Sequence, residues 1–129
     1  MYSWQAAGDW WDGVALVLQS LGHISNKWAR YEEAEGYFLR ALKICEKNPG
    51  KDPYILADTL HNLGALYFRG FSENEKAENY FKRALELEED VYGAESDEMK
   101  ETVKDYAALL RLIGRTEDAA KLESQDKKN

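Results

Sequence analysis

The segment YEEAEGYFLRALKI, from Tyr31 to Ile44, recurs 43 residues later as NEKAENYFKRALEL, from Asn74 to Leu87. Small and aromatic residues stand in register in the two copies, so that Ala34, Phe38 and Ala41 correspond to Ala77, Phe81 and Ala84. A third, weaker copy, TEDAAKLE, begins at Thr116 and has Glu123 where the other copies have Phe. A period of about 20 to 50 residues indicates an architecture of stacked repeat units.

A second recurring segment precedes each of these copies. Its positions are Leu18, Leu21 and Gly22, then Leu60, Leu63 and Gly64 at a spacing of 42 residues, and about 43 residues further Val103, Tyr106 and Ala107. A Gly in a helix interior costs roughly 1 kcal/mol relative to Ala, so Gly at two equivalent positions indicates a packing requirement. We expect two backbones to approach closely there, with Leu21, Leu63, Phe38 and Phe81 filling the neighbouring space.

Both segments have helical periodicity, because their apolar residues recur at spacings of three and four. Asn48-Pro49-Gly50 and Tyr92-Gly93-Ala94 break the pattern, while Asp52 before Pro53 and Ser96 before Asp97 are typical helix starts. The pattern predicts helices at about 10–28, 31–47, 53–69, 73–91, 96–112 and 116–126. We therefore expect an all-α fold in a single domain, 1–129, of three antiparallel helix pairs, with units 10–48, 52–91 and 95–126 and a frayed tail at 127–129.

Composition excludes several classes of protein. The chain has 129 residues, of which 44% are hydrophobic and 32% charged, enough to build a core. A net charge of −7 repels phosphate backbones, so we expect no nucleic-acid partner. No apolar run approaches the roughly 18 residues of a membrane span, and the first residues lack a secretory signal. We expect no membrane partner and a cytoplasmic protein, in keeping with a single Cys.

The sequence contains no constellation that indicates catalysis or metal binding. His23 and His61 are the only histidines, and no Cys or carboxylate stands at a ligand spacing from either. There is no phosphate-binding loop and no nucleophile elbow. Cys45 lies near the end of an apolar stripe and is predicted to be a buried small hydrophobe. We expect no enzyme activity, no cofactor and no metal.

At the level of motifs, LQSLGHIS followed by YEEAEGYFLRAL, and TLHNLGALY followed by EKAENYFKRAL, resemble the tetratricopeptide repeat family. The period of 42 to 43 residues and the linker VYGAESDEM are similar to the longer kinesin-light-chain type of repeat. The resemblance implies an α-solenoid, a right-handed superhelix in which the first helix of each pair lines a concave groove. It also implies a protein-interaction module or adaptor that binds a peptide or helix of another protein there.

Mapped onto this chain, the resemblance assigns ten residues to peptide binding: Gln19, His23, Asn26, Lys27, His61, Asn62, Phe68, Arg69, Lys104 and Arg111. Asn62 is expected to hold the peptide backbone, although a solvated or capping Asn is the alternative. The basic residues of this set are expected to hold acidic side chains or a terminal carboxylate. Chaperone-binding members of the family have a carboxylate clamp built on Lys and Asn, where this chain has Gln19 and His23, which argues against that role.

Four tryptophans, Trp4, Trp10, Trp11 and Trp28, are concentrated in or before the first unit. A terminal repeat has one face without a neighbour, so we expect these rings to fold over it as a lid. The alternative is an exposed patch for self-association. That alternative gives a second hypothesis for function, a structural module that forms homodimers through its Trp-rich end.

Overall fold

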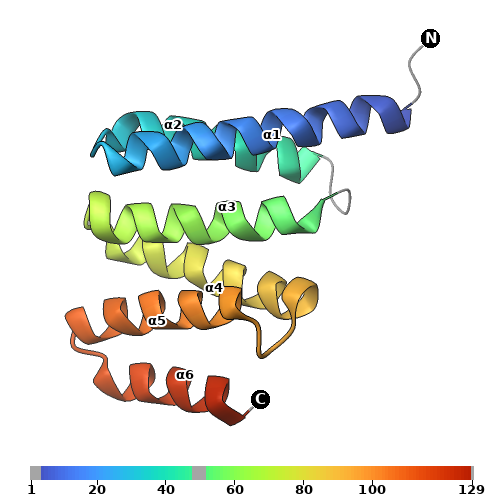
Figure 1. Ribbon diagram of the computed structural model, residues 1–129. Helices are drawn as coiled ribbons and strands as arrows, with labels where there is room; N and C mark the ends of the chain where they lie inside the picture. The colour runs from blue at the N-terminus through green and yellow to red at the C-terminus, as the bar shows by residue number, and fades with distance from the viewer. Residues whose placement is uncertain (1–3, 48–51, 129) are drawn as a thin grey trace.

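The computed structural model describes residues 4–47 and 52–128, and the side chains of residues 10–47 and 52–125. Within these residues the chain is entirely helical outside its turns. The elements are α1 (Trp4–Lys27), α2 (Tyr31–Lys47), α3 (Pro53–Ala65), the π-helical turn η1 (Leu66–Gly70), α4 (Asn74–Tyr92), α5 (Asp97–Leu112) and α6 (Thr116–Lys128). Successive helices form three antiparallel pairs that stack in chain order (Figure 1). The predicted all-α solenoid is confirmed.

The predicted helix starts at Asp52 and Ser96 are also confirmed. The Asp52 carboxylate accepts hydrogen bonds from the backbone N–H groups of Tyr54 and Ile55, and the Ser96 hydroxyl accepts one from that of Met99. α1 begins six residues before the predicted start at residue 10. α6 continues to Lys128 because no Gly or Pro ends it. The predicted break at Asn48-Pro49-Gly50 lies outside the described residues.

The second repeat has one residue more than the first between its two helices, and η1 accommodates it. Gly22 and Phe38 are 16 residues apart, whereas Gly64 and Phe81 are 17 apart. A π-helical turn adds one residue to a helix without ending it, and the widened turn at Leu66–Gly70 lies between Gly64 and Phe81. The predicted continuous helix at 53–69 therefore changes its geometry after Ala65. Both repeats keep the same packing despite the insertion.

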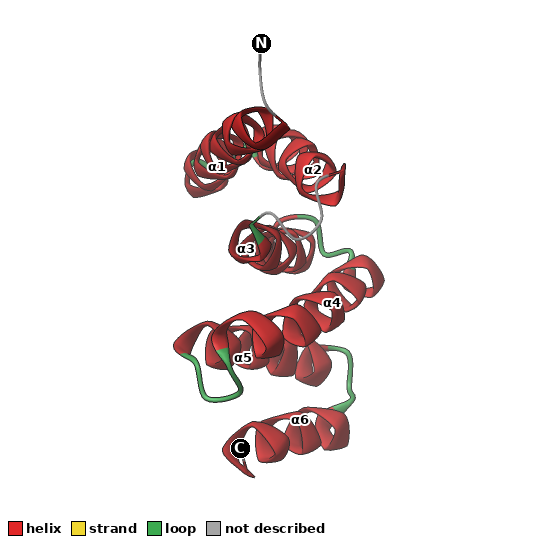
Figure 2. Cartoon of the chain, turned by 90° about the vertical axis from the view of Figure 1, so that its right-hand side faces the viewer, coloured by secondary structure: helices red, strands yellow, loops and turns green. Residues whose placement is uncertain are grey.

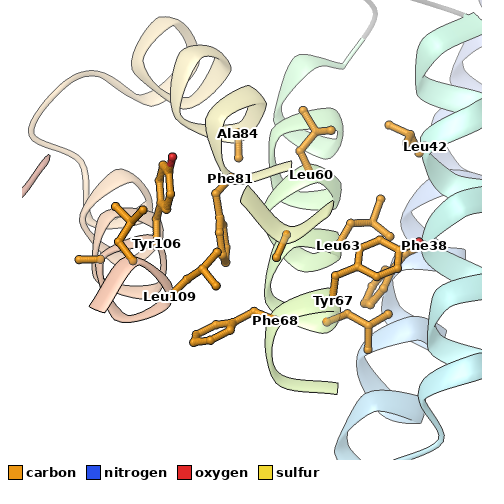
Figure 3. Packing of buried hydrophobic residues seen from close by; sticks show 14 of the residues in the cluster. Phe38, Leu42, Leu60, Leu63, Tyr67, Phe68, Phe81, Ala84, Tyr106 and Leu109 are labelled. Carbon is orange, nitrogen blue, oxygen red and sulfur yellow. The ribbon is translucent and has the colours of Figure 1, made fainter. Parts of the chain in front are cut away.

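The two equivalent glycines sit directly against the phenylalanines of the following helix. A Cβ added to Gly22 would lie 2.5 Å from Cε1 of Phe38, and one added to Gly64 would lie 2.7 Å from Cδ1 of Phe81. Both rings are completely buried, as are Leu63, Leu66 and Leu109. Figure 3 shows Phe81 between Leu60 and Leu109, and Phe38 beside Leu63 and Tyr67. The predicted close approach of the paired helices is therefore confirmed.

We expect Gly22→Ala and Gly64→Ala each to destabilise the fold by about 1–3 kcal/mol, because the new methyl group overlaps a ring that has no room to move. This is the net effect, after the gain of roughly 1 kcal/mol that Ala brings to a helix interior. Urea unfolding monitored by circular dichroism measures the difference.

Gly36 in α2 is the matched control, since a Cβ there meets nothing within 4 Å. Gly36→Ala should stabilise the protein by roughly 0.5–1 kcal/mol. Equal effects of the three substitutions would show that helix propensity, and not contact with Phe38 and Phe81, determines the stability of the variants.

The first helix exposes residues whose counterparts one repeat later are buried. Leu21 is one of them, so the prediction that it fills the space between the paired helices is wrong. Val17, Leu21 and Ile24 are 59%, 38% and 55% exposed. At a spacing of 42 residues, Thr59, Leu63 and Leu66 are 0%, 0% and 1% exposed. The reason is positional: α3 packs against α2, whereas no described element covers the corresponding face of α1.

The tryptophans do not form the predicted lid. Trp10 and Trp28 are 62% and 75% exposed, and Trp11 is 42% exposed. Trp10 and Trp11 contact each other edge to face, with ring centroids 4.7 Å apart, and the side chain of Trp4 lies outside the described residues. Trp10 and Trp11 contact each other and do not cover the open face of α1. The aromatic side chains therefore add to the exposed apolar surface.

Candidate functional site

The first helices of the three pairs, α1, α3 and α5, follow one another along one side of the stack (Figure 2). A cavity of about 190 Å³ opens where they meet. Four predicted site residues line it: Gln19, His23, His61 and Asn62. Four carboxyl side chains complete its lining: Asp58 from α3, Glu88 from α4, and Glu98 and Glu101 from α5. Three repeats therefore contribute to one polar cavity.

Asn62 and His23 join the first two repeats across the cavity. The Nδ2 atom of Asn62 lies 3.2 Å from Nε2 of His23, so the amide donates to the imidazole when that nitrogen carries no proton. Burial lowers the pKa of His23, which favours this neutral form. The imidazole also lies edge to face with Phe38, at 5.8 Å between ring centroids. Asn62 is thus placed by a contact between repeats, with its carbonyl oxygen left to accept a hydrogen bond.

His61 is held by α5 through both of its ring nitrogens. Its Nε2 atom lies 3.3 Å from Oδ2 of Asp105, and its Nδ1 atom contacts the hydroxyl oxygen of Thr102. The Thr102 hydroxyl has one proton, which it donates to Glu88 at 2.9 Å or to the backbone oxygen of Glu98 at 3.2 Å, so toward His61 it is an acceptor. Burial lowers the pKa of His61, but the hydrogen bond to Asp105 and the charge of Glu88 outweigh it and hold the pKa above its ordinary value. These contacts therefore favour the protonated form of His61 and join α3 to α5.

Two acids of the cavity are in surroundings that disfavour their charge. Glu88 is 1% exposed, and burial raises its pKa to about 7 although the hydrogen bond from Thr102 opposes the shift. Burial also raises the pKa of Asp58, against the effect of a 2.9 Å hydrogen bond from the Tyr92 hydroxyl. One carboxylate oxygen of Glu88 and the amide oxygen of Gln19 are buried without a hydrogen-bond donor among the described residues. The cavity lining is therefore rich in hydrogen-bond acceptors, and no Lys or Arg of the described residues belongs to it.

The other six predicted site residues lie outside the cavity lining. Asn26, Lys27 and Lys104 are exposed. Phe68 is 8% exposed and belongs to the hydrophobic core, where Arg69 covers its ring at 5.0 Å. Arg69 and Arg111 form ion pairs with Asp105 and Glu123. The structure thus brings together Gln19, His23, His61 and Asn62, and the expected basic character of the groove is absent from this cavity.

The sequence interpretation missed Glu88, the most buried of the cavity acids. Glu88 lies on a second helix, which was given no site residue, and it continues the buried stripe of Ala77, Phe81 and Ala84 at spacings of four, three and four. An acid on an apolar stripe was the signal that could have found it. The equivalent position one repeat earlier is Cys45, which is only half buried instead of fully buried, and burial raises its pKa to about 11.

Metal binding has no support in the described part of the chain. Among those residues no group of three or more His, Cys, Asp or Glu side chains is arranged to hold a metal ion. His23 and His61 contact Asn62, Thr102 and Asp105 instead. For the same residues, none of the helices combines the length and the apolar content that crossing a bilayer requires.

Comparison with known families agrees with this geometry. A family model described as tetratricopeptide repeat matches residues 10–87 and again residues 57–125. The chain belongs to the tetratricopeptide repeat family. Modules of this family generally mediate protein–protein interactions. The assignment to the longer kinesin-light-chain type of repeat stays a prediction.

Among solved structures, the chain is similar to BtubC (BKLC) from P. vanneervenii, with a TM-score of 0.73 at 20% sequence identity. The match covers 90% of this tetratricopeptide repeat chain and 45% of that protein, so the chain spans less than half of its length. At this identity the similarity concerns the fold alone. No curated protein matches the chain.

We expect Glu88→Gln to make the protein more stable at alkaline pH. Between pH 4.5 and about 7 the unfolded chain releases the Glu88 proton while the folded protein keeps it, so the contribution of Glu88 to stability falls as the pH rises. The amide is neutral and still accepts from Thr102. At pH 8 the variant should exceed the wild type by roughly 2–3 kcal/mol, and at pH 4.5 the difference should nearly vanish.

Urea unfolding of both proteins at the two pH values measures the difference in their free energy of unfolding. The contributions of the other titrating groups cancel, because both proteins share them. A pH-independent difference would show that Glu88 is not the buried acid described above.

Proposed function

We propose that the chain is a protein-interaction module that binds a peptide or helix of a partner protein along α1, α3 and α5, and that it has no chemistry of its own. The single observation that carries this proposal is the cavity in which Gln19 and His23 of the first repeat meet His61 and Asn62 of the second. A repeat stack presents its first helices as a continuous surface, which suits an elongated ligand.

Asn62 is the proposed contact to the partner backbone. Its amide group has a donor and an acceptor, the combination that pairs with a peptide unit regardless of side chain. Its Nδ2 atom already lies 3.2 Å from His23, which holds the amide in one orientation at the cavity. Arg69 is the proposed neighbouring contact, since 62% of its side chain is exposed while Asp105 and the Phe68 ring hold it in place.

We expect the double variant Asn62→Ala with Arg69→Ala to lower capture of partner protein from native cell extract by about tenfold, the effect of removing a binding hot spot. Helicity should be unchanged, because neither side chain belongs to the buried core. Circular dichroism and pull-down with quantification of the captured protein are the two measurements.

The matched control is Asn79→Ala with Arg83→Ala, which removes the same two residue types from α4, a second helix. Capture should be unaffected by the control pair. Equal capture by the groove variant and the wild type would reject the proposed assignment of Asn62 and Arg69.

A second candidate function is self-association through α1. Trp10, Val14, Val17, Leu21, Ile24 and Trp28 recur at alternating spacings of four and three, the seam of a two-helix coiled coil. All of them except the half-buried Val14 are exposed. Such a seam is complementary to an identical helix, so a second copy of this chain is the proposed occupant.

This candidate predicts a dimer in sedimentation equilibrium at concentrations of tens of micromolar, and a monomer for Leu21→Glu, which places a charge in the seam. Glu33→Gln, at an exposed position of α2, should leave the dimer intact. A wild-type monomer at all accessible concentrations would exclude the dimer.

A further inference from the structure

The cavity at the junction of α1, α3, α4 and α5 contains two buried acceptor atoms that no donor of the described chain reaches. They are the amide oxygen of Gln19 and one carboxylate oxygen of Glu88, whose residues are 7% and 1% exposed. Native proteins pair more than about 90% of such groups, and an unpaired one costs roughly 1–3 kcal/mol. Both residues line the cavity. A ligand that brings N–H donors to this place would be stabilised by both.

Charge at the cavity favours a cation. Asp58, Glu88, Glu98 and Glu101 line it, and no Lys or Arg is among the described residues that do. The His61 ring is already paired with Asp105, and His23 favours its neutral form. Arg69 pairs with Asp105 as well. The local field at the cavity is therefore negative.

Size and geometry restrict the kind of cation. The cavity measures about 190 Å³, below the roughly 300–1,000 Å³ of sites for drug-sized ligands. No cluster of His, Cys, Asp and Glu in the described part of the chain is arranged for a metal ion. An ammonium or guanidinium group on a flexible apolar stem satisfies both conditions, because its stem can pack against the side chains of the lining while its head donates to the acids.

We propose that this cavity is a specificity pocket of the groove and that it receives a lysine or arginine side chain of the bound protein segment. The inference rests on the proposed function and adds the chemical class of the partner's anchoring residue. Asn62 lines the same cavity, so the contact to the partner backbone and the pocket for its side chain are adjacent. A partner docks with its cationic residue opposite Asn62 and its N–H donors directed toward Glu88 and Gln19.

The test is selection of random peptides from a display library on the immobilised full chain, followed by affinity measurement on single synthetic peptides. We expect the enriched peptides to share a Lys or Arg, and replacement of that residue by Gln in the peptide to weaken binding about tenfold. Raising the salt concentration should weaken binding of the cationic peptide and leave the Gln peptide nearly unaffected.

In the protein, Glu88→Gln and Glu98→Gln should each lower the affinity for the cationic peptide at least fivefold. The matched control, Glu75→Gln at an exposed position of α4 that does not line the cavity, should not. The substitution in the peptide is independent of protein folding, so the test holds even if a cavity variant is unstable.

The outcomes separate the two proposals. Enriched peptides that lack a basic residue, that carry acidic ones instead, or whose affinity is indifferent to Glu88→Gln would overturn the pocket while leaving a peptide-binding groove. If binding of enriched peptides is unaffected by Asn62→Ala with Arg69→Ala as well, or if no peptide is enriched, the proposed groove fails and the pocket with it.

Discussion

The direct contact of a phenylalanine ring with the backbone of the neighbouring helix is the constraint on which the rest of this structure depends. At Gly22 and Gly64 the ring of the next helix occupies the space that any Cβ would take. The contact fixes how deeply the two helices of a pair interpenetrate. The next pair stacks on this arrangement: α3 and η1 contact α2, and Leu63 and Leu66 are completely buried.

Stacking in turn assembles the polar cavity. Residues of α1, α3, α4 and α5 meet there only because three pairs lie in register. At the cavity the contacts between repeats are polar: Asn62 with His23, and His61 with Asp105 and Thr102. The arrangement buries Glu88 in surroundings that disfavour its charge. Such a group lowers stability when it is charged, and beside an open cavity it is the group that we propose for recognition of a cation.

The parts of the fold set by local periodicity could be predicted from the sequence. Helix pairs, caps at Asp52 and Ser96, and the contacts of Gly22 and Gly64 with Phe38 and Phe81 follow from spacing, residue size and hydrogen-bonding capacity. So could four residues of the cavity, since first helices of stacked pairs share a surface.

What the sequence interpretation missed depends on which neighbour a residue meets in three dimensions. Leu21 has the same local context as Leu63 yet remains exposed, because burial there comes from a preceding helix. The π-helical turn absorbs an inserted residue that could equally have lengthened a loop. The sequence interpretation expected basic residues to bind the partner, but Arg69 and Arg111 form ion pairs with Asp105 and Glu123. Each of these ion pairs joins two different helices, so the sequence does not reveal it.

Proton NMR of the wild-type chain gives the most direct measurement of the ring contacts. We expect nuclear Overhauser contacts from the α-protons of Gly22 and Gly64 to the rings of Phe38 and Phe81, and displacement of those α-proton shifts by the aromatic ring currents. Gly36, which faces open space, should show neither effect. Ordinary helical α-proton shifts at all three glycines, with no cross-peak to either ring, would contradict the direct contact between glycine and ring on which the repeat stack and its cavity depend.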